Sequence, residues 1–170
     1  MTTINYISIM IFTFWGMEFM AWFLHKYVMH GPLWILHNDH HNPNPHRSYQ
    51  LNDFFALVFA VPSFLFILFD RILDLPALGA VGFGIMAYGG AYFFIHEIII
   101  HRRFKFFKIK PNRYFRALNS AHKIHHSQPT KEGCRNFGML VVSFEYFRKK
   151  MPQEKIPNDG RKTVVNQPDA

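Results

Sequence analysis

Three long apolar runs constrain the fold of this chain more than any other feature. They are Ile4 to Leu24, in which only Glu18 is charged, and two charge-free runs, Phe54 to Phe69 and Leu75 to Ile95. An α-helix rises about 1.5 Å per residue and a bilayer core is roughly 30 Å thick, so the two longer runs can cross it. The middle run is short unless Leu51 to Asp53 begin the helix. The sequence predicts three transmembrane helices.

The first run is predicted to be an uncleaved anchor. It lacks the charged start and the small-residue cleavage site of a secretory signal. A buried helical hairpin of a soluble protein is the alternative for these runs, and their length argues against it. Pro62 and the glycines of the third run are tolerated in membrane helices, where small residues permit close packing.

The distribution of basic residues predicts the orientation. No charged side chain precedes Glu18, and the link from Asp70 to Asp74 has one basic residue. The third run is followed by a stretch without acids that contains Arg102, Arg103, Lys105, Lys108, Lys110, Arg113 and Arg116. Because Lys and Arg mark the cytoplasmic side, we expect the N-terminus outside the cell inner or plasma membrane and every histidine on the cytoplasmic side.

Histidines form four short motifs at the ends of these runs. They are HKYVMH (His25, His30), HNDHH (His37, His40, His41), HEIIIH (His96, His101) and HKIHH (His122, His125, His126). An H-x4-H followed by H-x2-H-H therefore occurs twice, and His46 is the one histidine outside the motifs. This self-similarity predicts two pseudo-equivalent halves that converge on one site.

The spacing of the histidines indicates metal binding. On a helix, residues i, i+3 and i+4 share a face, so each H-x2-H-H directs three imidazoles to one side. Residues i and i+5 diverge by about 140° on a regular helix, so the two H-x4-H histidines either serve different metals or are brought together by a helix distortion. Neutral imidazole suits iron, zinc, copper or nickel. Ten imidazoles are too many for one ion and fit two. The alternatives are histidines that hydrogen-bond at the membrane interface, or adventitious metal binding.

Four carboxylates are candidates for supporting roles. Glu18 lies seven residues before His25, on the same helix face, where it could orient that imidazole through a hydrogen bond. Its alternative role is an acid that reaches water at the interface. Asp39, Asp53 and Glu97 are weaker candidates, because each could equally be a solvated or helix-capping acid.

The four motifs resemble those of the integral-membrane di-iron hydroxylases of the fatty acid hydroxylase superfamily, and among them the bacterial-type carotene-ring hydroxylases. The resemblance is carried by GMEFMAWFLHKYVMHG, LNDFFALVFA, MAYGGAYFFIHEIIIHRRF and AHKIHHSQPTKEGCRNFGML. It implies an all-α membrane fold of about three transmembrane helices with a cytoplasmic helical cap. It also implies that all ten motif histidines bind two non-haem iron ions, the catalytic dimetal centre, with O2 as co-substrate.

The activity that the resemblance implies is hydroxylation of the β-ionone rings of β-carotene at carbons 3 and 3′, which gives zeaxanthin through β-cryptoxanthin. Each hydroxylation needs two electrons, which reduced ferredoxin or a similar donor would supply. Alternatives that share the dimetal site are a fatty acid or sterol hydroxylase, a desaturase and a carotenoid ketolase. A membrane metal-binding or transport protein is more remote, because transporters place ligands near the bilayer midplane.

Charge and cysteine content exclude other classes. The formal net charge of +8 would suit a nucleic-acid partner, but membrane spans argue against one, and a basic cytoplasmic face could instead steer an acidic electron donor. No flavin or dinucleotide motif is present, so electrons must come from another protein. The single Cys134 excludes an intramolecular disulfide, and a haem-thiolate centre would leave the histidines unexplained.

The predicted domain organisation is simple. Residues 1–149 form the membrane-embedded hydroxylase domain, and the polar residues 150–170 form a disordered C-terminal tail. Within the domain, the apolar segment NFGMLVVSFEYF (136–147) is too short to cross a membrane, so it lies on the membrane or packs over the metal site.

Overall fold

The computed structural model describes residues 1–44, 47, 49–104, 112–132 and 136–147, and every regular element within these ranges is helical. In chain order the elements are α1 (Thr3–Phe23), the π-helical η1 (Leu24–Met29), α2 (Trp34–His41), the 3-10 helix η2 (Leu51–Ala56), α3 (Leu57–Leu73), α4 (Pro76–Phe93), the π-helical η3 (Phe94–Ile100), α5 (Arg113–His126) and the 3-10 helix η4 (Phe144–Phe147). The prediction of an all-α fold is confirmed.

Three continuous helices are long and apolar enough to cross a membrane. They are Thr3–Met29, Leu51–Leu73 and Pro76–Ile100. The first two contain their predicted spans and extend them, and the middle one begins at Leu51 with the 3-10 turn of η2. The third begins one residue later than predicted, at Pro76, and extends five residues beyond Ile95. Large apolar side chains such as Ile4 and Phe12 are 77% and 82% exposed on the outer surface, as contact with lipid requires. The chain is a membrane protein.

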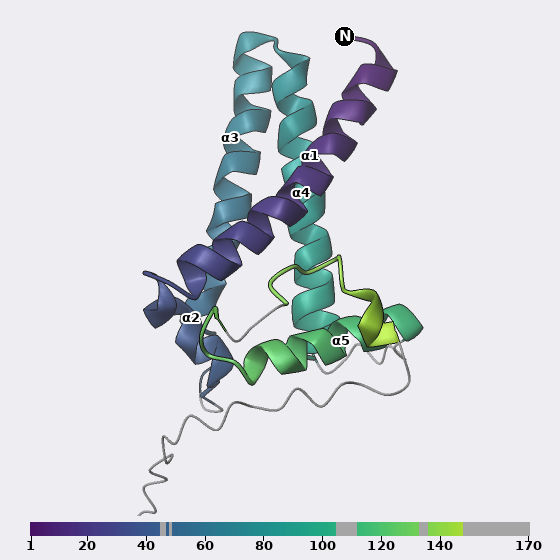
Figure 1. Cartoon of the computed structure of the whole chain (residues 1–170). Coiled ribbons are helices and arrows are strands. Elements are labelled where there is room, and N and C mark those ends of the chain that lie inside the picture. Colours follow the sequence, from purple (N-terminus) through teal and green to yellow (C-terminus); the bar gives the residue numbers. More distant parts are fainter. Residues whose placement is uncertain (45–46, 48, 105–111, 133–135, 148–170) are drawn as a thin grey trace, which may run out of the picture.

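Glycines allow the three long helices to approach closely. α3 and α4 form an antiparallel hairpin, and α1 crosses α4 (Figure 1). A Cβ atom on Gly82 would lie 2.9 Å from the carbonyl oxygen of Ser63 in α3, and one on Gly84 would lie 2.7 Å from the carbonyl oxygen of Met10 in α1. The hydroxyl of Ser63 donates to the carbonyl oxygen of Gly82 at 2.9 Å. Close packing at the glycines of the third span is therefore confirmed at these two contacts.

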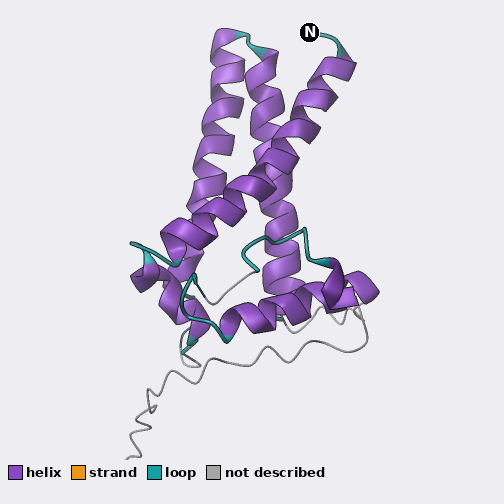
Figure 2. Cartoon of the chain, in the orientation of Figure 1, coloured by secondary structure: helices purple, strands orange, loops and turns teal. Residues whose placement is uncertain are grey.

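A cap of shorter helices lies at one end of the bundle. α2 and α5 are at the end away from the N-terminus, and α5 runs across that end below α4 (Figures 1 and 2). Asn112 caps the start of α5, because its side-chain oxygen accepts from the N–H of Phe115 at 2.9 Å. Leu118 of α5 packs with Ile95 and Met139 in a small apolar core. This cap brings all four histidine motifs together.

The segment 136–147 does not cross the bundle. It contacts α1 through Glu18 and packs Met139 and Tyr146 against α5. Phe137 is almost fully buried, and its ring lies 5.3 to 5.6 Å from those of His25, His30 and His125. The expected packing over the histidines is therefore observed at Phe137. His46, Cys134 and the predicted tail 150–170 lie outside the described residues.

Candidate metal centre

Two π-helical turns bring the histidines of each H-x4-H motif together. The N–H of His30 donates to the carbonyl oxygen of His25 at 3.0 Å, and the N–H of His101 donates to that of His96 at 2.9 Å. This i to i+5 bonding defines a π-helix, which holds an extra residue per turn and so returns positions i and i+5 to one side. The ring centroids are 5.3 Å apart in the first pair and 4.6 Å apart in the second. The helix distortion considered from the sequence is therefore present in both motifs.

The motif histidines gather into two clusters. We call His25, His30, His37 and His125 the first cluster, and His40, His101, His122 and His126 the second cluster. Within each, the candidate ligand nitrogens all lie within 4.8 Å of one another. Each cluster contains three histidines from one copy of the motif pair and one from the other copy. His125 of the second copy joins the first cluster, and His40 of the first copy joins the second cluster. The two copies converge, as predicted, and interlock.

His41 and His96 adjoin these clusters without belonging to either group of four. The ring of His41 lies 4.9 Å from that of His37 and 4.6 Å from that of His126, between the two clusters. The ring of His96 lies 4.6 Å from that of His101 and 4.7 Å from that of His40, beside the second cluster. All ten motif histidines therefore meet in one region of the cap.

The first cluster has the electronic arrangement of a cation site. Nδ1 of His25 lies 3.1 Å from the carbonyl oxygen of Phe137, and Nδ1 of His37 lies 2.6 Å from the side-chain oxygen of Asn52. Those oxygens only accept, so both Nδ1 atoms carry the proton and donate it. In the neutral rings both Nε2 atoms then carry lone pairs, yet they face each other at 3.1 Å. A metal ion between them would turn this repulsion into coordination.

The second cluster shows the same feature. Nε2 of His122 lies 2.9 Å from Nε2 of His101 and 2.8 Å from Nε2 of His126, and one proton can satisfy only one of these contacts. Nδ1 of His40 donates to the side-chain oxygen of Gln50 at 2.9 Å. Its buried Nε2 has no hydrogen-bond partner among the described residues. A buried polar atom of this kind is explained by a ligand that it binds.

Burial keeps these imidazoles neutral. Desolvation, followed by the neighbouring imidazoles, lowers the pKa of His41 and His101 to about 3. Desolvation also lowers the pKa of His37 to about 3 and that of His126 to about 4. Neutral imidazole is the form that binds metal, so the ligand nitrogens of both clusters are able to coordinate a metal at physiological pH. Each cluster could therefore hold a metal ion.

Glu97 has the supporting contact that the sequence suggested. Its Oε1 lies 2.6 Å from Nδ1 of His96, and its Oε2 accepts from Arg103 at 2.9 Å. Because the carboxylate accepts a hydrogen bond, Nδ1 of His96 carries the proton. The lone pair of Nε2 is then free to coordinate a metal ion. Glu97 is buried, so this contact is well shielded from water.

Asp39 and Asp53 contact the backbone of η2 instead of a histidine. The carboxylate of Asp39 accepts from the N–H groups of Leu51 and Asn52. That of Asp53 accepts from the N–H of Gln50 at 3.0 Å, as part of a capping box. Both are therefore helix-capping acids, one of their two expected roles. Asp39 thereby places Asn52, which orients His37, and Asp53 places Gln50, which orients His40.

The expected hydrogen bond from Glu18 to His25 is replaced by other partners. Oε1 of Glu18 accepts from the N–H groups of Met139, Leu140 and Val141 at 2.9 to 3.0 Å, and Oε2 accepts from the hydroxyl of Tyr88 at 2.7 Å. The segment 136–147 supplies these donors because it runs beside α1. Glu18 is buried by it, which also excludes the alternative of an acid that reaches water. It acts on His25 indirectly, by fixing the segment whose Phe137 carbonyl accepts from that ring.

Several supporting groups could not be identified from the sequence. Gln50 and Asn52 are polar residues just before an apolar run, and this position was the one sequence feature that could have indicated a role at the site. Arg103 looked like one basic residue among many. The carbonyl oxygens of Phe137 and Pro129, which accept from His25 and His30, belong to the backbone and leave no mark in a sequence.

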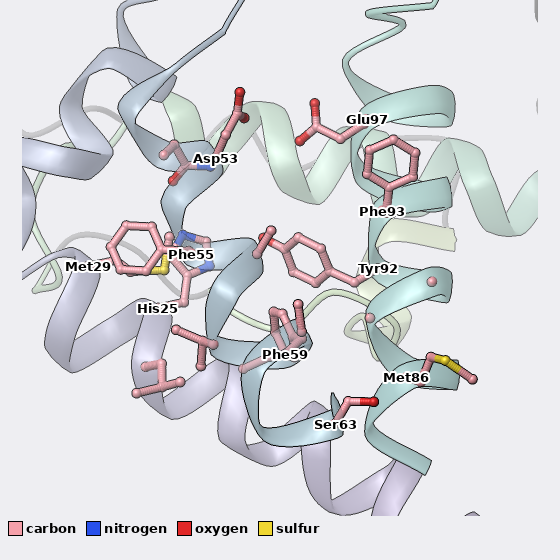
Figure 3. A pocket seen from close by; sticks show the side chains of 18 of the residues that line it. His25, Met29, Asp53, Phe55, Phe59, Ser63, Met86, Tyr92, Phe93 and Glu97 are labelled. Carbon is pink, nitrogen blue, oxygen red and sulfur yellow. The ribbon is translucent and has the colours of Figure 1, made fainter. Parts of the chain in front are cut away.

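A cavity of about 640 Å³ opens beside the first cluster. It lies between the ends of α1 and α4 and the η2 and α3 segment, and His25 forms part of its wall. Its sides are largely aromatic and aliphatic, with Phe55, Phe59 and Tyr92 among them, whereas Asp53 and Glu97 lie together at one end (Figure 3). An apolar molecule from the bilayer could therefore reach the histidines here.

Comparison with known proteins agrees with this geometry. The family model described as fatty acid hydroxylase matches residues 10–148. The "Beta-carotene hydroxylase" of Pantoea ananas is 40% identical over 127 residues, which cover 75% of this chain and 71% of the relative. The protein of the same name from Paracoccus sp. (strain PC1) is 31% identical over 153 residues, which cover 89% of this chain and 88% of the relative.

Plant relatives match over a shorter part of their length. The "Beta-carotene 3-hydroxylase, chloroplastic" of Gentiana lutea is 37% identical over 115 residues, which cover 66% of this chain and 36% of the relative. No solved structure matches the chain. The family match includes all four histidine motifs and the three membrane helices almost completely. The chain belongs to the fatty acid hydroxylase family.

Proposed function

We propose that this chain hydroxylates the β-ionone rings of β-carotene at carbons 3 and 3′, giving zeaxanthin through β-cryptoxanthin. The observation that carries the proposal is an apolar cavity that opens between membrane helices and has His25 of the first cluster in its wall. The names of the similar bacterial and plant proteins supply the substrate. A β-carotene molecule is entirely apolar, so it would enter such a cavity from the bilayer.

The proposed metals are two non-haem iron ions, one at each cluster, with all ten motif histidines as their ligands. Nitrogen donors suit iron, and His41 and His96 would complete five donors at each ion. The two ions would supply the oxidising chemistry, in which O2, two electrons and two protons yield one hydroxylated C–H bond and one water molecule. The chain's part is to hold the imidazoles neutral and to fix their orientation.

Side chains around the cavity would position the ring. Phe59 and Tyr92 face the same space, where they would pack against a β-ionone ring and exclude water (Figure 3). Gly89 and Gly90 give the α4 wall no side chain and so leave room for the ring. Glu97 and Arg103 close the polar end beside the histidines. The ring would therefore be held with one edge toward the metals.

The proposed sidedness and electron donor follow from the basic residues. In sequence, Arg102 to Arg116 contains seven Lys and Arg residues and no acid, which favours the cytoplasmic side for the cap and the outside for the N-terminus. A basic face would attract an acidic donor, for which we propose reduced ferredoxin or a similar protein.

We propose that residues 1–149 form the membrane-embedded hydroxylase domain and that residues 150–170 form a disordered tail.

The test is pigment analysis in a bacterial host that accumulates β-carotene. Cells that express the chain should contain zeaxanthin, identified by chromatography with mass detection, and cells that express an equal amount of His125→Ala should keep β-carotene. Unchanged β-carotene beside well-expressed wild-type protein would overturn the proposed substrate in favour of another lipid. Keto-carotenoids would retain the metal centre and overturn the reaction.

A further inference from the structure

Arg103 joins two carboxylates that lie on different elements of the cap. Its Nη1 donates to Oδ1 of Asp53 at 2.7 Å and to Oε2 of Glu97 at 2.9 Å, and its Nη2 donates to Oδ2 of Asp53 at 3.0 Å. A planar guanidinium can serve both acids in one fixed geometry, whereas the ammonium group of lysine cannot. Arg103 therefore links Asp53 of η2 to Glu97 of η3.

The backbone after η3 is bent to bring Arg103 into this place. Arg102 has a left-handed conformation, with φ of 52°, and the N–H of Arg103 donates to the carbonyl oxygen of Glu97 at 3.0 Å. The chain thus turns back on η3 directly after His101. The side chain of Arg103 is 25% exposed, so its bonds to the two acids are partly shielded from water.

One arm of this arrangement ends at His96. Glu97 uses one oxygen to accept from Arg103 and the other to accept from Nδ1 of His96 at 2.6 Å. With its second oxygen held by Arg103, the carboxylate has one orientation in which it meets the imidazole. The position of the guanidinium therefore determines the direction of the His96 ring.

The other arm ends at His40. Asp53 accepts from Arg103 and also from the N–H of Gln50 at 3.0 Å, and the side-chain oxygen of Gln50 accepts from Nδ1 of His40 at 2.9 Å. His40 and His96 come from different copies of the motif pair. Their rings stack, with centroids 4.7 Å apart and an interplanar angle of 29°.

We propose that Arg103 is a positioning residue for the second cluster and its neighbour His96: it orients His40 and His96 together, so that an Nε2 atom from each copy of the motif pair faces the same metal. The first cluster has supports of its own, in the Phe137 carbonyl for His25 and in Asn52 for His37. Asp39, which does not contact Arg103, holds the N–H of Asn52. Loss of Arg103 should therefore weaken one metal site and spare the other.

The inference rests on the proposed metal sites. Titration of the metal-free protein in detergent with cobalt(II) measures the number and affinity of these sites and does not depend on hydroxylation activity. The wild type should bind two cobalt ions per chain. Arg103→Met should weaken one of the two by about 10- to 100-fold, the usual effect of removing a group that orients a metal ligand. Arg103→Lys keeps the charge but cannot hold both acids in the same geometry, so its cobalt affinity at that site should lie between those of the wild type and Arg103→Met. Arg102→Met is the matched control, since it removes the same charge from the neighbouring exposed residue.

Combination with ligand variants identifies the affected site. Arg103→Met added to His101→Ala should leave the affinity for the remaining cobalt ion unchanged, whereas added to His25→Ala it should weaken the remaining ion by about the same 10- to 100-fold. The absorption bands of the cobalt that remains in Arg103→Met should match those of His101→Ala. Equal weakening of both ions, or unchanged affinity for both, overturns the positioning role. A wild type that binds no cobalt overturns the metal sites themselves and this inference with them.

Discussion

The carboxylate of Glu18 accepts from the N–H of Leu140 with both of its oxygens, at 2.9 and 3.1 Å, although 122 residues separate the two in the chain. The neighbouring N–H groups of Met139 and Val141 donate to the same carboxylate. Gly138 permits this approach, because a Cβ atom there would lie 2.9 Å from Oε1 of Glu18. The transmembrane helix α1 is thereby fastened to the segment that covers the first cluster.

Glu18→Gln should lower the free energy of unfolding by about 2 kcal/mol. The amide nitrogen would present a donor where Leu140 and Tyr88 need an acceptor, and a buried hydrogen bond to a charged group is worth about 1.5–3 kcal/mol. Unfolding in mixed micelles, followed by circular dichroism, measures the change. Tyr88→Phe removes one bond to the same carboxylate and should cost about 1.5 kcal/mol, the lower end of that range. A Glu18→Gln protein as stable as the wild type would contradict this account.

Loss of one histidine should remove about half of the metal. His25→Ala deprives the first cluster of one donor and His101→Ala the second, so each purified protein should hold roughly one iron where the wild type holds two. Mass spectrometry of the acid-digested protein, normalised to protein content, gives the ratio. His46→Ala is the control, because His46 lies outside the motifs. An equal loss of metal in that control would show that the clusters are not the binding sites.

The metals should stay bound at pH 5. Protons compete with the metal for a histidine that has the ordinary pKa of about 6.5, so at pH 5 such a ligand binds its metal much more weakly. His37, His41 and His101 have pKa values of about 3 and His126 of about 4, so these ligands stay neutral until the pH falls toward 4. Equilibrium dialysis of the iron-loaded protein across a pH series measures the midpoint of release. A midpoint near pH 6.5 would indicate adventitious binding to exposed imidazoles.

The metal-free protein should become less stable over the same range. Its folded state binds fewer protons than its unfolded state, because the folded pKa of His37, His41 and His101 is near 3 and the unfolded pKa is about 6.5. The free energy of unfolding is therefore greatest above pH 6.5 and falls as the pH is lowered toward 3. Unfolding midpoints at pH 7 and pH 5, with and without metal, measure the effect. Equal midpoints for the metal-free protein at both values would refute it.

A large side chain at position 90 should block the substrate and spare the metals. Gly90 lines the cavity, and a Cβ atom there meets nothing within 4 Å, so Gly90→Ala should be tolerated. Gly90→Phe should reduce zeaxanthin formation by at least about tenfold, which corresponds to about 1.4 kcal/mol in the activation free energy. Gly16→Phe is the control, since Gly16 also has open space around it but lies outside the cavity. Full activity of Gly90→Phe would place the substrate elsewhere.

The sequence predicted the membrane helices and the histidine site because both depend on local patterns. Long apolar runs indicate the spans, and the repeated histidine spacing indicates the two copies of the motif pair. The π-helical turns at His25 to His30 and His96 to His101 could not be predicted, since a regular helix was an equally good reading of that spacing. The real partners of Glu18 could not be predicted either, because they are backbone N–H groups more than 120 residues away. Contacts of this kind exist only once the chain has folded.

The exchange of His40 and His125 between the clusters has a consequence for assembly. One copy of the motif pair, taken alone, supplies three histidines to one cluster and a fourth to the other, so it completes neither. A polypeptide with a single copy could build a full cluster only by pairing with a second polypeptide that returned the missing imidazole. Both copies follow helices that end on the same side of the bundle, α1 and α4, so such a pair would stand side by side in the bilayer (Figure 1). By carrying both copies in one chain, this protein makes the completion of its clusters independent of its own concentration.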